Sequence, residues 1–202
     1  MDIGSFNKLV NENKNSNRPW YFGLDGSWWY GMGEDDVRKK ILVGLNGLKI
    51  NLGCGLDRRD GYLNIDIRTD VGADVVLDLE RAPYPFADNS AEEAIAKDLI
   101  EHFSFRDIEK LLRELHRILK SGGKLIIQTP DLEQIMGSIN NKEISGFWNI
   151  SYWLYGGQEY RENYHKLIFT KDEMKLLLER IGFRVDNIYS GGTNLICEAV
   201  RI

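Results

Sequence analysis

The chain has 202 residues, of which 43% are hydrophobic and 28% charged, and its formal net charge is −5. These values fit one globular domain of ordinary size and exclude a disordered chain. The acidic balance, without a Lys/Arg cluster beyond pairs such as Arg58-Arg59, disfavours nucleic acid as a partner. No apolar run approaches the roughly 18 residues that a membrane span needs, and residues 1–17 lack the apolar stretch of a secretory signal. We therefore expect a cytoplasmic protein with no membrane span.

The first 46 residues differ from the rest of the chain. Aromatic residues crowd among glycines in 18–33, and the apolar periodicity of 34–45 predicts a short helix. We treat 1–46 as an N-terminal extension and 47–202 as the main domain. Two cysteines, Cys54 and Cys197, lie neither in a CxxC pair nor at zinc-ligand spacing from a histidine. We therefore expect reduced thiols and no metal site.

From residue 48 onward, strand and helix patterns alternate. Strands are expected at 48–52, 62–67, 73–77, 93–96 and 124–129. A helix is expected at 104–119, begun by a capping box of Ser104 and Asp107 and ended by Gly122 and Gly123. A second helix begins after Thr170, which has Glu173 as its capping partner, and stops at Gly182. Strands at 183–189 and 194–202 then form a hairpin.

This alternation predicts an α/β fold of the Rossmann-like, doubly wound class. The sheet is expected to be mostly parallel, with helices on both faces and an antiparallel strand contributed by the C-terminal hairpin. One segment, 136–165, is too aromatic for a solvated loop and too irregular for a clear helix. It lies between a strand and a helix, where binding loops usually occur, so we expect an aromatic lid. The alternative is that its tyrosines and tryptophans are simply core.

Small and acidic residues follow the first three strands of the main domain. Gly53 and Gly55 come directly after the strand ending at Leu52, and glycines there let the backbone approach a ligand. Asp66 ends the second strand and can accept hydrogen bonds from the two hydroxyls of a ribose. Asp78 and the backbone N–H of the next residue end the third, where they could face an adenine edge.

The spacing of these residues narrows the class of cofactor. A dinucleotide site needs G-x-G-x-x-G with an acidic residue about 20 positions further on. Here Arg58 stands in the third glycine's position and Asp66 comes too soon, which disfavours a nicotinamide enzyme. The phosphate-binding P-loop pattern is also absent from the sequence. The combination therefore favours a nucleoside that carries no phosphate.

Six motifs in order make the chain similar to a known family. They are Leu52-Gly53-Cys54-Gly55, Asn64-Ile65-Asp66, Asp78-Leu79, Pro85-Phe86-Ala87-Asp88-Asn89-Ser90, Ile100-Glu101-His102 and Arg117-Ile118-Leu119-Lys120-Ser121-Gly122-Gly123. Together they resemble the class I S-adenosylmethionine-dependent methyltransferases of the type 11 methyltransferase-domain family. The resemblance is strong over 49–130, and its weaker continuation is similar to members from surface-polysaccharide gene clusters. The family commonly has proline where Ser121 stands, and the short 55–66 segment indicates a truncated first helix.

The resemblance implies S-adenosyl-L-methionine as the cofactor and a set of contacts to it. Gly53 and Gly55 would line its methionine part, Asp66 would hold the ribose, and Asp78 and Leu79 would flank the adenine. Asp98, Glu101 and His102 would lie near the sulfonium and the substrate entrance. The full set of predicted cofactor-binding residues is Asn51, Gly53, Cys54, Gly55, Asp66, Ile67, Asp78, Leu79, Asp98 and Glu101.

Two of the three histidines are candidates for proton transfer. His165 follows the aromatic segment and is the candidate general base, although a hydrogen bond that anchors the lid is an equal alternative. His102 is a second catalytic candidate or a packing residue, and His116 is expected on the surface. We expect a methyltransferase acting on an oxygen or nitrogen of a small-molecule or saccharide-like acceptor. The alternative is a non-catalytic or partner-dependent cofactor-binding subunit, with the aromatic N-terminus as its docking surface.

Overall fold

The computed structural model describes residues 21–22, 28–29, 47–84 and 86–202. Two short strands, β1 (Tyr21–Phe22) and β2 (Trp28–Trp29), pair with each other in antiparallel fashion. The remaining strands form one sheet: β3 (Leu48–Leu52), β4 (Leu63–Asp66), β5 (Val75–Val76), β6 (Ala91–Lys97), β7 (Leu119–Pro130), β8 (Phe183–Gly191) and β9 (Asn194–Arg201). The helix predicted at 34–45 and the boundary at residue 46 lie outside the described residues, so the division into domains stays a prediction.

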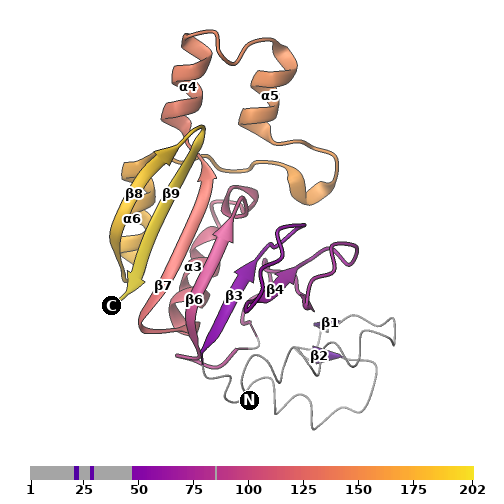
Figure 1. The fold of residues 1–202 in the computed structure, drawn as a ribbon, viewed down its shortest axis with the longest axis vertical. Helices are drawn as coiled ribbons and strands as arrows, with labels where there is room; N and C mark the ends of the chain where they lie inside the picture. The colour runs from indigo at the N-terminus through magenta and orange to yellow at the C-terminus, as the bar shows by residue number, and fades with distance from the viewer. Residues whose placement is uncertain (1–20, 23–27, 30–46, 85) are drawn as a thin grey trace.

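The sheet has the strand order β5-β4-β3-β6-β7-β9-β8 (Figure 1). All neighbouring pairs are parallel except those that involve β9, which runs antiparallel to both β7 and β8. The predicted mostly parallel sheet with one antiparallel hairpin strand is therefore confirmed. Because β3 pairs with both β4 and β6, the chain leaves β3 in one direction and later returns on its other side. In open α/β sheets, ligands bind at the carboxyl ends of strands around such a switch point.

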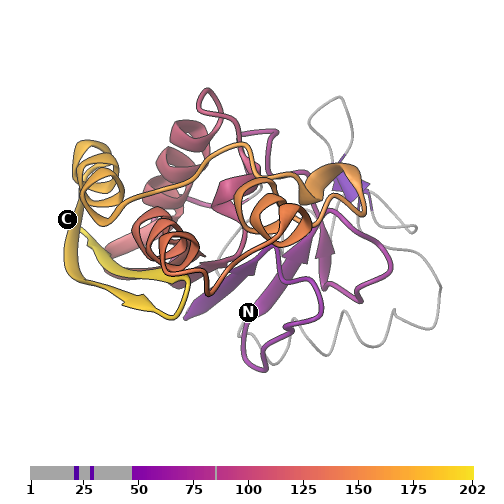
Figure 2. The ribbon, with the colours of Figure 1, turned by 90° about the horizontal axis from the view of Figure 1, so that it is seen from above.

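The hydrophobic core lies between the sheet and two helices, α3 (Ile108–Ile118) and α6 (Lys171–Ile181), which cover the same face (Figures 1 and 2). The opposite face carries Lys49, Glu93 and Lys124 in register across three strands. Among the described residues, no helix packs on this face; the connections 53–62 and 67–74 contain turns instead. The expected truncation of the first helix is thus confirmed. None of the described helices has the length and apolar character needed to cross a membrane.

The two long helices differ in how well their ends were predicted. The capping box of Thr170 and Glu173 is present, and Gly182 ends α6 in the left-handed conformation with φ +113°. The predicted cap of α3 is wrong, because Asp107 precedes the first helical residue and Ser104 closes the turn before it, donating its hydroxyl to the Asp107 carboxylate at 2.6 Å. A helix begun by this turn starts at Ile108, four residues later than Ser104 suggests.

The end of α3 was also predicted incorrectly. The helix stops at Ile118, and the chain enters β7 at Leu119, so Gly122 and Gly123 lie inside a strand rather than at a helix end. The pairing of β6 with β7 shifts register between Leu119 and Lys124, which gives these glycines a role in a bulge. A Cβ on Gly123 would lie 2.8 Å from the Lys120 carbonyl oxygen. Pairing with β6 therefore sets the end of the helix, and the glycines allow the bulge that follows.

His116 is not a surface histidine, as its position beside the apolar stripe suggested. Its ring packs edge-on against Phe183, with ring centroids 5.3 Å apart. The Nε2 atom is buried, and a Cβ on Gly182 would lie 2.7 Å from it. Burial lowers the pKa of His116, and the cationic side chain of Arg201 adds to this effect. The residue thus fills the junction between α3 and the end of α6.

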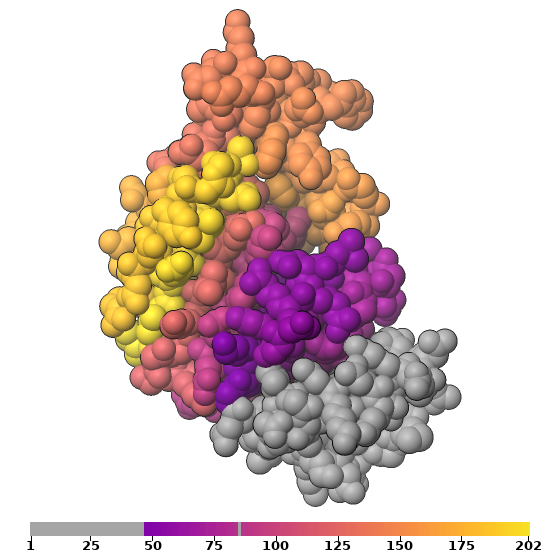
Figure 3. Space-filling model, viewed as in Figure 1, coloured from indigo at the N-terminus to yellow at the C-terminus, as the bar shows by residue number. Residues whose placement is uncertain are grey.

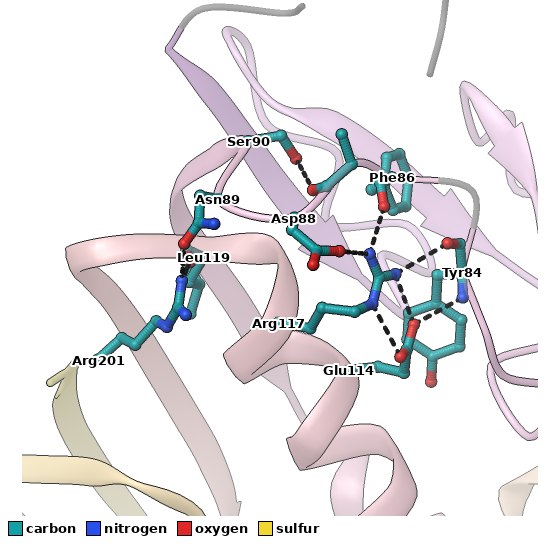
Figure 4. A network of polar contacts seen from close by, with 10 residues as sticks. Tyr84, Phe86, Asp88, Asn89, Ser90, Glu114, Arg117, Leu119 and Arg201 are labelled. Carbon is teal, nitrogen blue, oxygen red and sulfur yellow. Dashed lines mark hydrogen bonds and ion pairs between the residues drawn. The ribbon is translucent and has the colours of Figure 1, made fainter. Parts of the chain in front are cut away.

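Arg117 links two of the family motifs, 85–90 and 117–123. Its guanidinium donates to the carbonyl oxygens of Tyr84 and Phe86 at 3.0 and 2.7 Å and pairs with Asp88 and Glu114, both at 2.7 Å (Figure 4). The Glu114 carboxylate in turn accepts the Tyr84 amide at 2.8 Å. One side chain of α3 therefore holds the loop that leads into β6, and β6 carries the acidic end of the site described below.

We expect Arg117→Met to lower the free energy of unfolding by about 2–4 kcal/mol, because the Tyr84 and Phe86 carbonyl oxygens and the Glu114 carboxylate all lose the hydrogen bonds of the guanidinium. Arg113 on the same helix is the matched control, since its side chain is 61% exposed and pairs with Glu109 at 3.6 Å. Arg113→Met should cost less than about 1 kcal/mol. Urea denaturation of the three proteins measures both values, and equal losses would contradict the anchoring role.

The same contact predicts a dependence on pH. Burial of Glu114 favours its neutral form, but hydrogen bonds from Arg117 and the Tyr84 amide outweigh burial and hold its pKa below the usual 4.5. A carboxylate with a lowered pKa stabilises the fold above its unfolded pKa and loses that contribution as the pH falls through the folded value. The stability difference between wild type and Arg117→Met should therefore stay constant above about pH 5 and shrink below about pH 4. Denaturation curves across this range test the expectation.

Candidate functional site

The loop after β3 is shaped by its glycines. Gly53 and Gly55 adopt φ values of +58° and +48°, which favour glycine. A Cβ on Gly53 would lie 2.6 Å from Leu99 Cδ1, so this position tolerates no side chain, whereas a Cβ on Gly55 would meet open space. The Cys54 amide donates to the Ile65 carbonyl at 2.9 Å and ties the loop to the next strand. The backbone at Gly55 is thus presented toward space beyond the strand ends.

Asn51 positions this loop. Its side chain is 2% exposed and donates to the Asp57 carbonyl at 2.8 Å and to the Asn64 side-chain oxygen at 3.0 Å. The same Asn64 oxygen accepts the Arg59 amide at 2.8 Å. Of the predicted cofactor residues, Asn51 therefore has its side chain occupied by the protein, and its contribution to a ligand would be through the loop that it holds.

Asp66 lies at the tip of β4, beside the glycine loop. Its side chain is buried, with one oxygen accepting the Gly55 amide and the other the Arg68 amide, each at 2.8 Å. Each carboxylate oxygen has a second lone pair, so both can still accept a further hydrogen bond.

Burial and the neighbouring acids Asp66 and Asp74 raise the pKa of Cys54 to about 12. Cys54 is consequently a buried, free thiol with no nucleophilic character.

The other residues predicted to bind the cofactor near β4 and β5 differ in exposure and in their partners. Asp78 lies after β5, with one oxygen accepting the Glu80 amide at 3.0 Å and the other paired with Arg81 at 3.0 Å. Leu79 is buried, and its carbonyl accepts the Tyr84 hydroxyl at 2.6 Å. Ile67, directly after β4, is 40% exposed. Ile67 and Asp78 therefore lie after neighbouring strands, as the pattern predicts.

The end of β6 carries the second half of the site. Asp98 has an exposed carboxylate that accepts from Gln128 at 3.0 and 3.2 Å, and its own φ is +49°. In the following turn, η1 (Ile100–His102), Ile100 and Glu101 are buried. Glu101 is 1% exposed and accepts the Thr129 hydroxyl at 3.0 Å. Burial raises the pKa of Glu101 to about 8.

His165 joins this group from far along the chain. Its ring centroid lies 5.2 Å from that of His102, and its amide donates to the Tyr155 carbonyl at 3.0 Å. His102 Nδ1 lies 3.1 Å from the Tyr164 carbonyl, and the Lys166 amide donates to the Glu101 carbonyl at 2.7 Å. Burial lowers the pKa of both histidines, so both rings are neutral near pH 7. We call Glu101, His102 and His165 the Glu–His–His cluster.

The segment 156–166 spans several strand ends. The Arg68 guanidinium, after β4, lies 4.8 Å from the centroid of the Tyr160 ring. Lys166 pairs with Glu80, after β5, at 2.9 Å. The Glu–His–His cluster connects the same segment to the end of β6. The segment therefore lies over the edge that carries the glycine loop and Asp66.

The segment predicted as a lid, 136–165, begins within α4 (Leu132–Asn140) and includes α5 (Phe147–Tyr155) and a short turn, η2 (Arg161–Asn163). Asp131 caps α4 and accepts the Ser190 hydroxyl at 2.7 Å, which fixes the lid base to the β8–β9 hairpin. The two helices rise beyond the sheet in Figures 1 and 3. The alternative that these aromatics are core is wrong, since Trp148 is 82% and Phe147 74% exposed, and α5 buries no residue.

Sequence reasoning missed the partners that organise this site. The glycine and acidic residues follow local patterns, whereas Thr129, Tyr160 and the Glu101–His165 contact depend on long-range packing. Zinc-ligand spacing is a local pattern, so it does not detect a cluster whose histidines are separated by three α-helices and a strand. The sequence holds a weak indication for Thr129. This residue ends the predicted strand 124–129, and a neighbouring predicted strand, 93–96, precedes Glu101.

Comparison with protein families decides the identity of the fold. The family model described as "Methyltransferase domain" (Methyltransf_11) matches residues 52–127, which include the glycine loop, Asp66 and the Glu101-His102 pair. The chain thus carries a methyltransferase domain of this family over these residues, and its fold is that of the class I S-adenosylmethionine-dependent methyltransferases. Its cofactor is S-adenosyl-L-methionine, and the predicted enzyme class is confirmed. No curated protein has a significantly similar sequence.

Many solved structures share the fold, at low sequence identity. A methyltransferase from Methanosarcina mazei is 16% identical, with a TM-score of 0.56 over 85% of this chain and 99% of that one. A methyltransferase from Mesorhizobium loti is 16% identical, with a TM-score of 0.54 over 89% of this chain and 100% of that one. A third, from Haloferax volcanii in complex with the Trm112 methyltransferase activator, is 14% identical, with a TM-score of 0.54 over 81% and 87%.

The described residues of this methyltransferase fit its cofactor. Open space lies beyond Gly55, where a Cβ would meet no atom within 4 Å, and the Asp66 carboxylate beside it keeps acceptor capacity for hydroxyl groups. Exposed Asp98 places negative charge near the Glu–His–His cluster, where a cation is favoured. These groups can therefore hold a charged nucleoside without phosphate-binding machinery.

Proposed function

We propose that this methyltransferase transfers a methyl group to an oxygen or nitrogen of a small-molecule or saccharide-like acceptor. The acceptor would bind between the 156–166 segment and the carboxyl ends of the strands. The observation that carries the proposal is the approach of His165 to His102 and Glu101 beside the strand edge that bears Asp66. A neutral imidazole there is available to take a proton from a bound hydroxyl.

The cofactor contacts are part of the proposal. Gly53 and Gly55 would line the methionine part through their backbone, Asp66 would accept from the ribose hydroxyls, and Asp78 with Leu79 would flank the adenine. The cofactor supplies a methyl group on a cationic sulfur, which is a good leaving group. Asp98 would place a carboxylate near that cation. Ile67, Cys54 and Asn51 would act by packing and by holding the loops.

The protein's main contribution to the reaction would be alignment. Positioning two reactants can lower a barrier by about 7–11 kcal/mol. The residues named above would hold the cofactor so that the methyl group it supplies faces the acceptor oxygen. The acceptor's proton passes to His165, and His102 supports the ring beside it. A base adds roughly 10²–10⁴-fold when the acceptor is a hydroxyl.

The exposed aromatic residues favour a small organic or saccharide acceptor over a protein side chain. Tyr152, Tyr155, Tyr160 and Tyr164 are each between 42% and 57% exposed, and they lie on the segment next to His165. Aromatic faces with a few convergent polar groups are typical of small-ligand sites. Hydroxyl groups of a saccharide could also bond to the tyrosine hydroxyls.

The test is formation of S-adenosylhomocysteine from the cofactor with a panel of free sugars, nucleotide-linked sugars and small amines. We expect turnover with at least one hydroxyl or amine acceptor above the acceptor-free rate, with the product heavier by one methyl group. Methylation of carbon alone, or of proteins alone, would contradict the proposed acceptor class. We further propose that the reaction takes place in the cytoplasm.

A second candidate is a methyltransferase domain that acts only with a partner protein. The observation that favours it is α5, which is composed mainly of aromatic and aliphatic residues, exposes four of its aromatic side chains and buries none of its residues. Exposed apolar surfaces of this kind often mark interfaces. This candidate predicts binding of S-adenosylhomocysteine by the isolated chain without turnover across the whole panel.

A further inference from the structure

We propose that the Glu–His–His cluster binds a divalent metal ion. One ligand atom from each of Glu101, His102 and His165 lies within 4.8 Å of the others, a separation that small side-chain movements can close around one ion. Two imidazoles and one carboxylate suit zinc, manganese and iron(II) rather than calcium. The proposal rests on the site named in the proposed function and assigns it a cation that the sequence pattern did not suggest.

The surroundings of Glu101 suit a bound cation. Its side chain is 1% exposed, and within the described residues no lysine or arginine forms an ion pair with it. Its hydrogen bond comes from the neutral Thr129 hydroxyl at 3.0 Å. Buried carboxylates are normally paired, protonated or bound to a metal. A divalent ion held by the adjacent histidines would supply the positive charge that this carboxylate lacks.

The histidines are held in the way that metal-binding histidines usually are. His102 Nδ1 contacts the Tyr164 carbonyl at 3.1 Å, and the Asp98 backbone also lies beside the ring. A backbone carbonyl on the second nitrogen fixes the tautomer and ring orientation of such a ligand. The His165 Nδ1 atom is buried without a well-formed hydrogen bond, and the Trp153 backbone lies beside the ring.

The ion would have open positions on the side of the acceptor. Both histidines are only half-buried, and three protein ligands leave one or more positions for an oxygen of the acceptor. A bound hydroxyl becomes more acidic on a divalent ion, so its proton leaves to solvent more readily. Neighbouring hydroxyl groups, as in saccharides, could chelate the ion. In the loaded enzyme, His165 would hold the ion that activates the acceptor instead of taking the proton itself.

The chain has few other side chains that could bind such a metal ion. The sequence contains three histidines and two cysteines, and both cysteines are buried. Only His116 lies outside the cluster, where it packs on Phe183. A protein without an affinity tag therefore has one place where histidine ligands can bind a metal. His116→Gln is the matched control, because it removes a histidine and leaves the cluster untouched.

The experiment is calorimetric titration of the full, tag-free chain with Zn²⁺ and separately with Mn²⁺, after chelator treatment and without cofactor. We expect one ion per chain for at least one of these metals. His102→Ala, His165→Ala and Glu101→Gln should each weaken binding by about 100-fold or more, and Thr129→Val, which frees the Glu101 carboxylate, by about tenfold. His116→Gln should bind as the wild type does, and circular dichroism confirms that each variant is folded.

Two results overturn the proposal: folded wild type that binds neither metal, or cluster variants that bind as tightly as His116→Gln does. The readout does not depend on methyl transfer. Turnover that survives complete removal of metal, together with no metal binding, would reject the ion and leave the proposed function standing. Metal binding with the expected variant pattern but no turnover with any acceptor would support the ion and reject the proposed function.

Discussion

Asp66→Ala should weaken binding of S-adenosylhomocysteine by two orders of magnitude or more. A carboxylate at this strand tip accepts two charge-assisted hydrogen bonds in the proposed complex, each worth about 1.5–3 kcal/mol. The substitution also removes the acceptor of the Gly55 amide at 2.8 Å, so the glycine loop loses its link to β4. Isothermal titration calorimetry at equal protein concentration measures the loss directly.

Two variants separate charge from geometry. Asp66→Asn keeps the shape and one acceptor oxygen, so its affinity should fall between those of wild type and Asp66→Ala. Asp70→Asn is the matched control, because this nearby carboxylate is 67% exposed and pairs with Arg68 on the outside of the loop. It should bind as the wild type does. Wild-type affinity in Asp66→Ala would remove the ribose assignment.

His165→Ala should lower turnover by roughly 10²–10⁴-fold while cofactor affinity stays within about threefold of wild type. The His165 ring centroid lies 5.2 Å from that of His102, on the segment over the strand ends, whereas the contact expected to hold the cofactor joins the Gly55 amide to the Asp66 carboxylate. The expected loss is in kcat with saturating cofactor. Single-turnover rates with the best acceptor of the panel measure it.

Added imidazole offers a control for the His165 prediction. A cavity left by the missing ring can admit free imidazole, so partial recovery of the rate in His165→Ala is expected and a purely structural defect should not respond. The His116→Gln variant should keep the wild-type rate, because His116 packs against Phe183 in the core. Loss of cofactor binding in folded His165→Ala would show that this residue anchors the lid instead.

Local sequence patterns predicted the sheet and the strand-end residues well. The strand at 48–52, the glycines after it and the capping box at Thr170 are determined by neighbours in sequence, and the structure contains all of them. The end of α3 was different, because pairing of Leu119 with β6 overrode the glycine signal at Gly122. Propensity identifies where a helix can end, and tertiary pairing selects the end that forms.

The centre of the candidate site could not have been predicted from local patterns. His102 and His165 approach each other only because the lid returns across the strand ends, held by the Tyr160–Arg68 and Lys166–Glu80 contacts. The periodicity of α5 is obscured by its composition, since apolar residues make up most of the helix and none of them is buried. A helix that buries nothing gives no amphipathic signal to detect.

A crystal structure of the protein with S-adenosylhomocysteine tests the central claim most directly. The account predicts that the ribose hydroxyls contact Asp66, that the methionine part lies along Gly53 to Gly55, and that the sulfur faces the side where Glu101, His102 and His165 meet. A ligand bound elsewhere, or one whose sulfur points away from these three residues, would contradict it.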